Sequence, residues 1–83
     1  MPEVNCPQMV TDIRRRISTI GSSMSVDEVY TATAYVNGWI DGLRYAALID
    51  HATWNNLCNE AKALGGQRIG WLESVIAADS VHN

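Results

Sequence analysis

The chain has 83 residues, a formal net charge of -3, 47% hydrophobic residues and 18% charged residues. This length predicts a single domain, and the apolar fraction is too high for a disordered chain. No apolar run approaches the roughly 18 residues of a membrane span. The N-terminal residues also lack the basic start and apolar stretch of a secretory signal.

The first predicted helix covers residues 8–20. Pro7 suits the first turn of a helix, with Asn5 or Cys6 as the capping residue. The apolar residues that follow recur with helical spacing and form one stripe; they are Val10, Ile13, Ile17 and Ile20. Gly21 is expected to end the helix as a C-terminal glycine.

The second predicted helix covers residues 25–48 and begins with a capping box. The Ser25 hydroxyl can accept a hydrogen bond from the Glu28 amide, while the Glu28 carboxylate reaches back to Ser25. One face of this helix carries the residues that we expect to pack in the core. These residues are Val29, Ala32, Thr33, Val36, Trp39, Ile40, Leu43 and Ala47.

The opposite face of the second helix is also apolar or small. Small residues at four-residue spacing let another backbone approach closely, and each glycine in a helix interior costs roughly 1 kcal/mol relative to alanine. We therefore expect self-association, most simply as a homodimer, through Ala34, Gly38, Gly42, Tyr45 and Ala46. The alternative is that the alanines are ordinary helix formers and the glycines are tolerated.

The chain is expected to turn at Ile49 and Asp50, because one helix from residue 25 to residue 79 would be on the order of 80 Å long. Asp50 is a good N-cap for the next helix. Gly65-Gly66 then interrupts the pattern, and either ends this helix or kinks it. A continuous helix would bring Arg68 close to the apolar face, which favours a break or kink.

These patterns predict an all-α domain of three or four helices, built on an antiparallel helical hairpin with the first helix packed across it. The expected segments are a lead-in at 1–7, helices at 8–20, 25–48 and 51–64, a continuation of the third helix or a fourth helix at 67–79, and a frayed tail at 80–83.

Residues that could carry catalysis or bind a metal show no recognisable spacing. Asp50 is better used as a cap, so His51 would point outward from the first turn and lack a nucleophile to serve. The remaining candidates form no zinc or carboxylate-bridged metal pattern; they are Cys6, Cys58, His82, Asp41, Glu60 and Glu73. We therefore expect no enzyme activity, no cofactor and no metal, in a cytoplasmic protein with reduced thiols.

Arg14, Arg15 and Arg16 form the most concentrated charge in the chain. Three arginines on a short helix could form a solvated face, bind an acidic protein surface, or contact phosphates. The sequence pI of about 5.1 argues against nucleic acid. Tyr35 and Trp71 lie off the best core stripes, so we include them with the arginines as candidate partner-binding residues.

The main functional hypothesis is a non-catalytic protein-binding module, an inhibitor or adaptor that occludes a partner protein. In size, acidity and lack of catalytic motifs the chain resembles the small accessory proteins of phages and mobile elements, including anti-defence inhibitors such as anti-CRISPR proteins. One alternative is a nucleic-acid-binding regulator that uses Arg14–Arg16 and Arg44. Another is a helical oligomer that binds a small ligand between subunits near Trp39, Tyr45 or Trp71.

Overall fold

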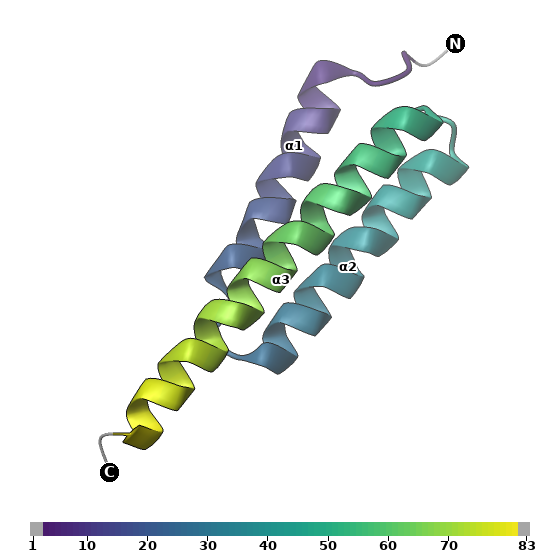
Figure 1. Ribbon diagram of the computed structural model, residues 1–83. Helices are drawn as coiled ribbons and strands as arrows, with labels where there is room; N and C mark the ends of the chain where they lie inside the picture. Colours follow the sequence, from purple (N-terminus) through teal and green to yellow (C-terminus); the bar gives the residue numbers. More distant parts are fainter. Residues whose placement is uncertain (1–2, 82–83) are drawn as a thin grey trace.

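The structure is a computed structural model that describes residues 3–81, and the side chains of residues 3–79. Its helices are α1 (Pro7–Ser18), the short 3-10 helix η1 (Thr19–Ser22), α2 (Val26–Tyr45) and α3 (His51–Val81) (Figure 1). The described residues contain no strand, which confirms the all-α class.

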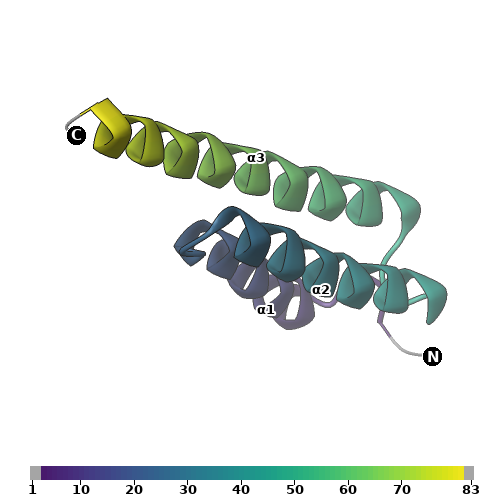
Figure 2. The ribbon, with the colours of Figure 1, turned by 90° about the horizontal axis from the view of Figure 1, so that it is seen from below.

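The three α-helices pack together in an elongated shape of 61 × 18 × 16 Å. The chain reverses direction after α2, so that α3 runs back alongside it (Figure 1). α3 packs against both α1 and α2, which also contact each other (Figure 2). No helix within the described residues combines the length and the apolar character that crossing a membrane requires.

The hydrophobic core lies where these helices meet. It consists of Ile13, Ile17, Ile20, Val29, Val36, Ile40, Ile49, Leu57, Ala61 and Leu72. The stripe predicted for the first helix is therefore largely buried. Complete burial of side chains of this size contributes about 1.5–3 kcal/mol each relative to exposure, so these residues supply most of the driving force for folding.

α1 begins at Pro7, in the first turn, where the missing proline N–H costs no hydrogen bond. The prediction that Gly21 ends this helix is wrong. α1 ends at Ser18 and tightens into η1, which carries Ile20 into the core. Because none of the described glycines has a positive φ angle, Gly21 does not form a left-handed helix cap.

The predicted lead-in is not loose where the structure describes it; residues 1–2 lie outside the described part. The Asn5 backbone N–H donates to the Leu48 carbonyl at 2.8 Å. The Asn5 side chain donates to the Asp50 carboxylate at 2.9 Å and accepts from the Asp50 backbone N–H at 3.1 Å. Asn5 has a left-handed φ of 58°, which asparagine tolerates better than most residues.

At the start of α2, one of the two hydrogen bonds of the predicted capping box forms as expected. The Glu28 amide donates to the Ser25 hydroxyl at 3.1 Å, as expected. The Glu28 carboxylate, however, accepts from the backbone N–H of Met24 at 2.6 Å and not from that of Ser25. The reciprocal bond therefore lies one residue earlier in the chain, and it still satisfies a backbone donor at the start of the helix.

α2 ends at Tyr45, three residues before the predicted end. The Leu48 amide donates to the Leu43 carbonyl at 2.9 Å, and the Ala47 amide to the Arg44 carbonyl at 3.0 Å. This is the Schellman arrangement, with Ala47 at the left-handed position and a φ of 59°. The helix stops here because these bonds satisfy its last carbonyls.

α3 is continuous from His51 to Val81, so the chain does not break at Gly65-Gly66, and residues 67–79 continue the third helix, which is one of the two predicted alternatives. Arg68 does not disrupt the helix, since its Nε donates to the Ser23 carbonyl at 2.7 Å and its guanidinium lies 4.1 Å from the Trp71 ring centroid. Of the predicted frayed tail, residues 80–81 belong to α3, while residues 82–83 lie outside the described part.

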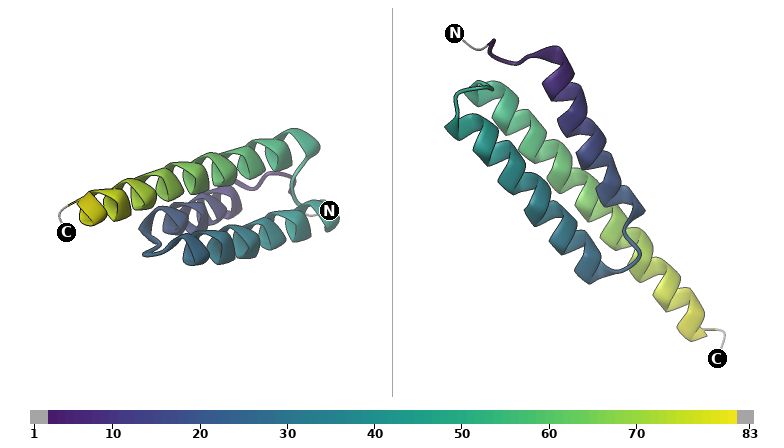
Figure 3. Two further views of the ribbon diagram at one scale, coloured as in Figure 1. Left: turned by 60° about the horizontal axis from the view of Figure 1, so that its bottom comes forward. Right: turned by 180° about the vertical axis from the view of Figure 1, so that it is seen from behind.

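Beyond Leu72, α3 extends past the ends of η1 and α2 (Figures 1 and 3). We call residues 73–81 the α3 overhang. Among the described side chains of α3, Leu72 is the last buried one, and those of residues 73–79 in the overhang are all exposed.

Candidate protein-binding surface

The surface of α1 and α2 that is not covered by α3 contains a set of connected shallow hollows. One lies between α1 and α2, a second between η1 and α2, and a third along α2 alone. Residues of α3 line none of them. We call this surface the open face and define it by Met9, Arg16, Thr19, Ala34, Tyr35, Gly38, Trp39, Gly42 and Leu43.

The α2 part of the open face combines exposed aromatic side chains with very small residues. Ala34, Gly38 and Gly42 are exposed, and a Cβ added at either glycine would meet no atom within 4 Å. Tyr35 is 61% exposed, and Tyr45, which lies beyond the open face at the end of α2, is 95% exposed. Residues 29–40 contain no charged side chain, so this part of the surface is largely uncharged.

Trp39 corrects the sequence-based prediction, which placed it in the core. Its side chain is 41% exposed, and the Arg16 guanidinium lies 3.9 Å from its ring centroid. Trp39 lies at the α1–α2 boundary, next to the hollow between these helices. The stacked pair places a cation and an aromatic ring side by side on the open face, in the geometry of a cation–π contact.

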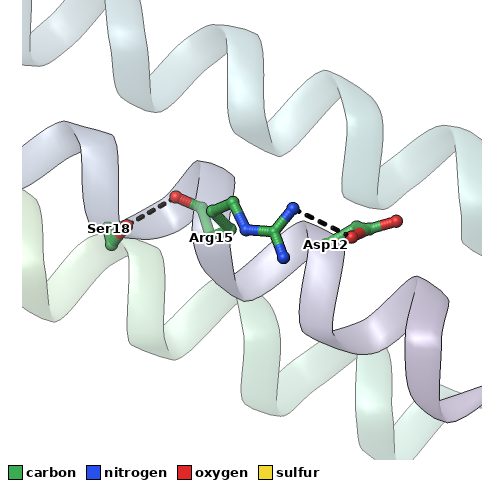
Figure 4. A network of polar contacts seen from close by, with 3 residues as sticks. All are labelled: Asp12, Arg15 and Ser18. Atoms are coloured by element: carbon green, nitrogen blue, oxygen red, sulfur yellow. Dashed lines mark hydrogen bonds and ion pairs between the residues drawn. The ribbon is translucent and has the colours of Figure 1, made fainter.

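The three consecutive arginines have three different environments. Arg14 pairs with Glu60 of α3 at 3.2 Å. Arg15 pairs with Asp12 at 3.3 Å, one turn earlier on α1, and its carbonyl accepts a hydrogen bond from the Ser18 hydroxyl (Figure 4). Arg16 stacks on Trp39. The run therefore does not form one basic patch, because each side chain leaves the helix in a different direction.

The other predicted interface residues divide between two parts of the molecule. Tyr35 lies on the open face, and exposed Ala46 and Tyr45 follow it at the end of α2. Trp71 lies on α3, 53% exposed, with Arg68 stacked on it. The structure does not bring Trp71 together with the arginine run.

Two titratable residues lie next to the α2–α3 turn, Asp50 and His51, and each contacts neighbouring residues of the fold. Hydrogen bonds from the Thr53 backbone and the Asn5 side chain lower the pKa of Asp50, which caps α3 through a 2.8 Å bond from the Thr53 amide. His51 is exposed, with its ring centroid 5.3 Å from that of Trp54. Asp50 thus acts as a helix cap next to an exposed imidazole.

Burial, and to a lesser extent the charge of Asp41, raises the pKa of the Cys58 thiol. A raised pKa keeps the thiol protonated near neutral pH and makes it a poor nucleophile. Asp41 itself accepts a hydrogen bond from the indole N–H of Trp54 at 2.8 Å. Within the described residues, no three His, Cys, Asp or Glu side chains are grouped so that they could hold a metal ion.

No family model, curated protein or solved structure matches the chain. The surface must therefore be interpreted from its own geometry. The open face is the strongest candidate, because it combines concave shape, exposed aromatic rings and a shortage of charge.

Sequence reasoning missed both cation–π pairs. Arg68 and Trp71 are three residues apart on one helix, so their spacing was a usable signal. Arg16 and Trp39 lie on different helices, and no local pattern relates them. Their contact follows from the way α1 packs beside α2.

Proposed function

We propose that this chain is a non-catalytic protein-binding domain, a small inhibitor or adaptor that acts by covering part of a partner protein. The observation that supports this proposal most directly is the exposure of Tyr35, Trp39 and Tyr45 around the small residues of α2. Tyrosine, tryptophan and arginine are the residues most enriched among those that dominate binding energy at protein interfaces. Arg16, stacked on Trp39, adds the third type.

The proposal includes self-association as a homodimer of antiparallel α2–α3 hairpins. Gly38 and Gly42 leave room for another backbone to lie close to α2. Each glycine costs roughly 1 kcal/mol in an exposed helix interior, and a close contact with another chain would offset that cost. The contact would be formed by Ala34, Gly38, Gly42, Tyr45 and Ala46.

We place the protein in the cytoplasm and among accessory proteins of the phage or mobile-element type, including anti-defence inhibitors. This part of the proposal is supported by small size, acidity and the absence of catalytic motifs in the sequence. The ion pairs of Arg14 and Arg15 favour a protein partner over nucleic acid, because both guanidinium groups already contact a carboxylate.

The experiment compares three full-length proteins as baits in lysate of the source cell, with captured proteins identified by mass spectrometry. The baits are the wild type, Gly38→Leu/Gly42→Leu, and Gly66→Leu/Gly70→Leu. The last is a matched control, since its glycines have the same spacing and the same open space around a Cβ. We expect the wild type and the control to capture the same partner and the α2 variant to lose it.

Both double variants should fold, because leucine has a higher helix propensity than glycine and all four positions are exposed. Circular dichroism spectra should therefore show the helix content of the wild type in both variants, with a cooperative melt. If the well-folded α2 variant captures the same partner as the wild type, the open face is not the binding surface.

A further inference from the structure

We propose that the turn between α2 and α3 is a hinge, and that two copies of the chain exchange their α3 helices when this hinge opens. Each α3 then packs on α1 and α2 of the other copy and not on those of its own chain. Asn5 acts as the latch that holds the turn closed. Exchange uses the core-facing side of α3, so it is separate from the open-face contact proposed above.

The turn is short and carries backbone strain. It consists of residues 46–50, between the end of α2 and the start of α3 (Figure 1). Ala47 has a φ of 59°, a left-handed conformation that is unfavourable for an L-residue with a Cβ. Glycine is the usual residue at this place after a helix. A short connection under strain favours exchange of the element that follows it, because the strain is released when the connection straightens.

The sequence of the turn favours the straight form. Residues 43–64 contain neither glycine nor proline. Positions 46–48 are alanine, alanine and leucine, which are among the best helix formers. One helix from Val26 to Val81 would be about 84 Å long. In that helix Ala47 has an ordinary right-handed conformation, so its strain is gone.

The core-facing stripes of α2 and α3 are in phase across the turn. At about 100° per residue, the mean directions of the two stripes in one straight helix differ by about 35°. Both stripes therefore face the same side of the straight helix, where a second copy that runs antiparallel can contact both. The buried residues that define the stripes are Val29, Val36 and Ile40 on α2, and Leu57, Ala61, Gly65 and Leu72 on α3.

Exchange keeps the contacts that α3 makes with the rest of the fold. In the closed chain the Trp54 indole N–H donates to Asp41 at 2.8 Å, and the Arg68 Nε donates to the Ser23 carbonyl at 2.7 Å. The same groups meet when α3 comes from the other copy, because each half of the exchanged dimer repeats the closed fold. Only the contacts of the turn itself are lost, which makes exchange a low-cost route to a dimer.

Asn5 forms hydrogen bonds that exist only while the turn is closed. Its backbone N–H donates to the Leu48 carbonyl, and its side chain forms two hydrogen bonds with Asp50. In the straight helix the Leu48 carbonyl accepts from the amide four residues later and is no longer available to Asn5. Ile49, which is 1% exposed, also leaves the core. The latch and Ile49 therefore favour the closed chain, whereas the strain at Ala47 favours exchange.

The test distinguishes a closed chain from a straight one by a distance within the chain. Spin labels replace Tyr30 and Gln67, which are exposed positions on α2 and α3, through non-natural amino acids. In the closed chain the labels lie on packed helices, so we expect a distance below about 30 Å. In the straight helix residues 30 and 67 are about 55 Å apart. The labelled chain is refolded from urea at millimolar concentration with a large excess of the same unlabelled variant, so that each exchanged dimer holds one labelled copy.

Asn5→Gly is the variant that opens the latch. It removes both side-chain hydrogen bonds to Asp50, and glycine accepts the left-handed φ of 58° at this position. We expect the fraction of chains with the long distance to be at least tenfold higher in Asn5→Gly than in the wild type, and to rise with concentration. An Asn5→Gly protein that shows only the short distance at millimolar concentration would overturn the proposal. Equal long-distance fractions in the two proteins would overturn the role of Asn5.

Two glycine variants in the Asn5→Gly background test the strain at the hinge. Ala46→Gly and Ala47→Gly weaken the straight helix by the same loss of helix propensity. Only Ala47→Gly also relieves the closed turn, since residue 46 has an ordinary φ of -78°. We expect the long-distance fraction to be at least tenfold lower with Ala47→Gly than with Ala46→Gly. Equal fractions would show that strain at Ala47 does not drive the exchange.

Adding Gly38→Leu/Gly42→Leu to Asn5→Gly separates exchange from the open-face dimer. Both glycines have open space around a Cβ and lie outside the contact with α3, so the long distance should persist at the same fraction. Sedimentation equilibrium of the same sample should give twice the chain mass. Loss of the long distance in this variant would mean that exchange depends on the open face, and would contradict the separate contact proposed here.

Discussion

The hydroxyl oxygen of Thr33 on α2 lies 3.1 Å from the point where a Cβ would stand on Gly65 of α3. Val29 Cγ1 and Ile20 Cγ2 lie at 3.6 and 3.8 Å from the same point. Gly65 is itself buried, whereas a Cβ on Gly66 would meet nothing within 4 Å. The two adjacent glycines therefore have different roles, and only Gly65 is needed for close packing of α3 on α2.

Alanine at these two positions should have opposite effects. Gly66→Ala should raise the free energy of unfolding by about 1 kcal/mol, because it gains helix propensity at an exposed site. Gly65→Ala gains the same helix propensity, but its added Cβ crowds Thr33. Its free energy of unfolding should therefore lie about 1 kcal/mol below that of the wild type. Urea denaturation at low protein concentration measures both. The Gly65→Ala penalty should shrink in a Thr33→Ala background, and equal effects of the two alanines would contradict this account.

Glycine at the end of α2 should stabilise the protein. Ala47 has a φ of 59°, where an L-residue with a Cβ is strained. Ala47→Gly should raise the free energy of unfolding by about 0.5–1 kcal/mol, since relief of this strain outweighs the extra freedom of glycine in the unfolded chain. Ala47→Val should lower it, because a β-branched residue fits this conformation worse. A destabilised Ala47→Gly protein would show that the cap is not left-handed in solution.

The Asp50 cap should make stability depend on pH in the acid range. Hydrogen bonds lower the pKa of Asp50 in the folded chain, so its contribution is complete above the ordinary value of about 3.9 and is lost as pH falls through the folded pKa. Asp50→Ala should therefore lower Tm at pH 7, and the difference from the wild type should narrow with acidification. Asp50→Ser should retain the cap without that pH dependence. A difference in Tm that is constant with pH would contradict this role.

Much of the helical order could be predicted from local signals. The spacing of Ile13, Ile17 and Ile20 indicates a single buried face, and these residues are buried. Asp50 is recognisable as a cap because its side chain acts on an amide only three residues away. Signals of this kind lie within one or two helical turns of chain.

The features that could not be predicted depend on contacts between distant segments. Gly65-Gly66 looks like a helix break until Thr33 is known to face it. Trp39 has the spacing of a core residue, but it lies at the α1–α2 boundary and stacks under Arg16. Asn5 reads as part of a loose lead-in, and only the fold brings it to Leu48 and Asp50.

The central claim is that the open face of α2 is covered by another chain, and the solution mass of the wild type tests it most directly. Sedimentation equilibrium at tens of micromolar should give twice the chain mass of 9.1 kDa. A single species of 9.1 kDa throughout that range would contradict self-association.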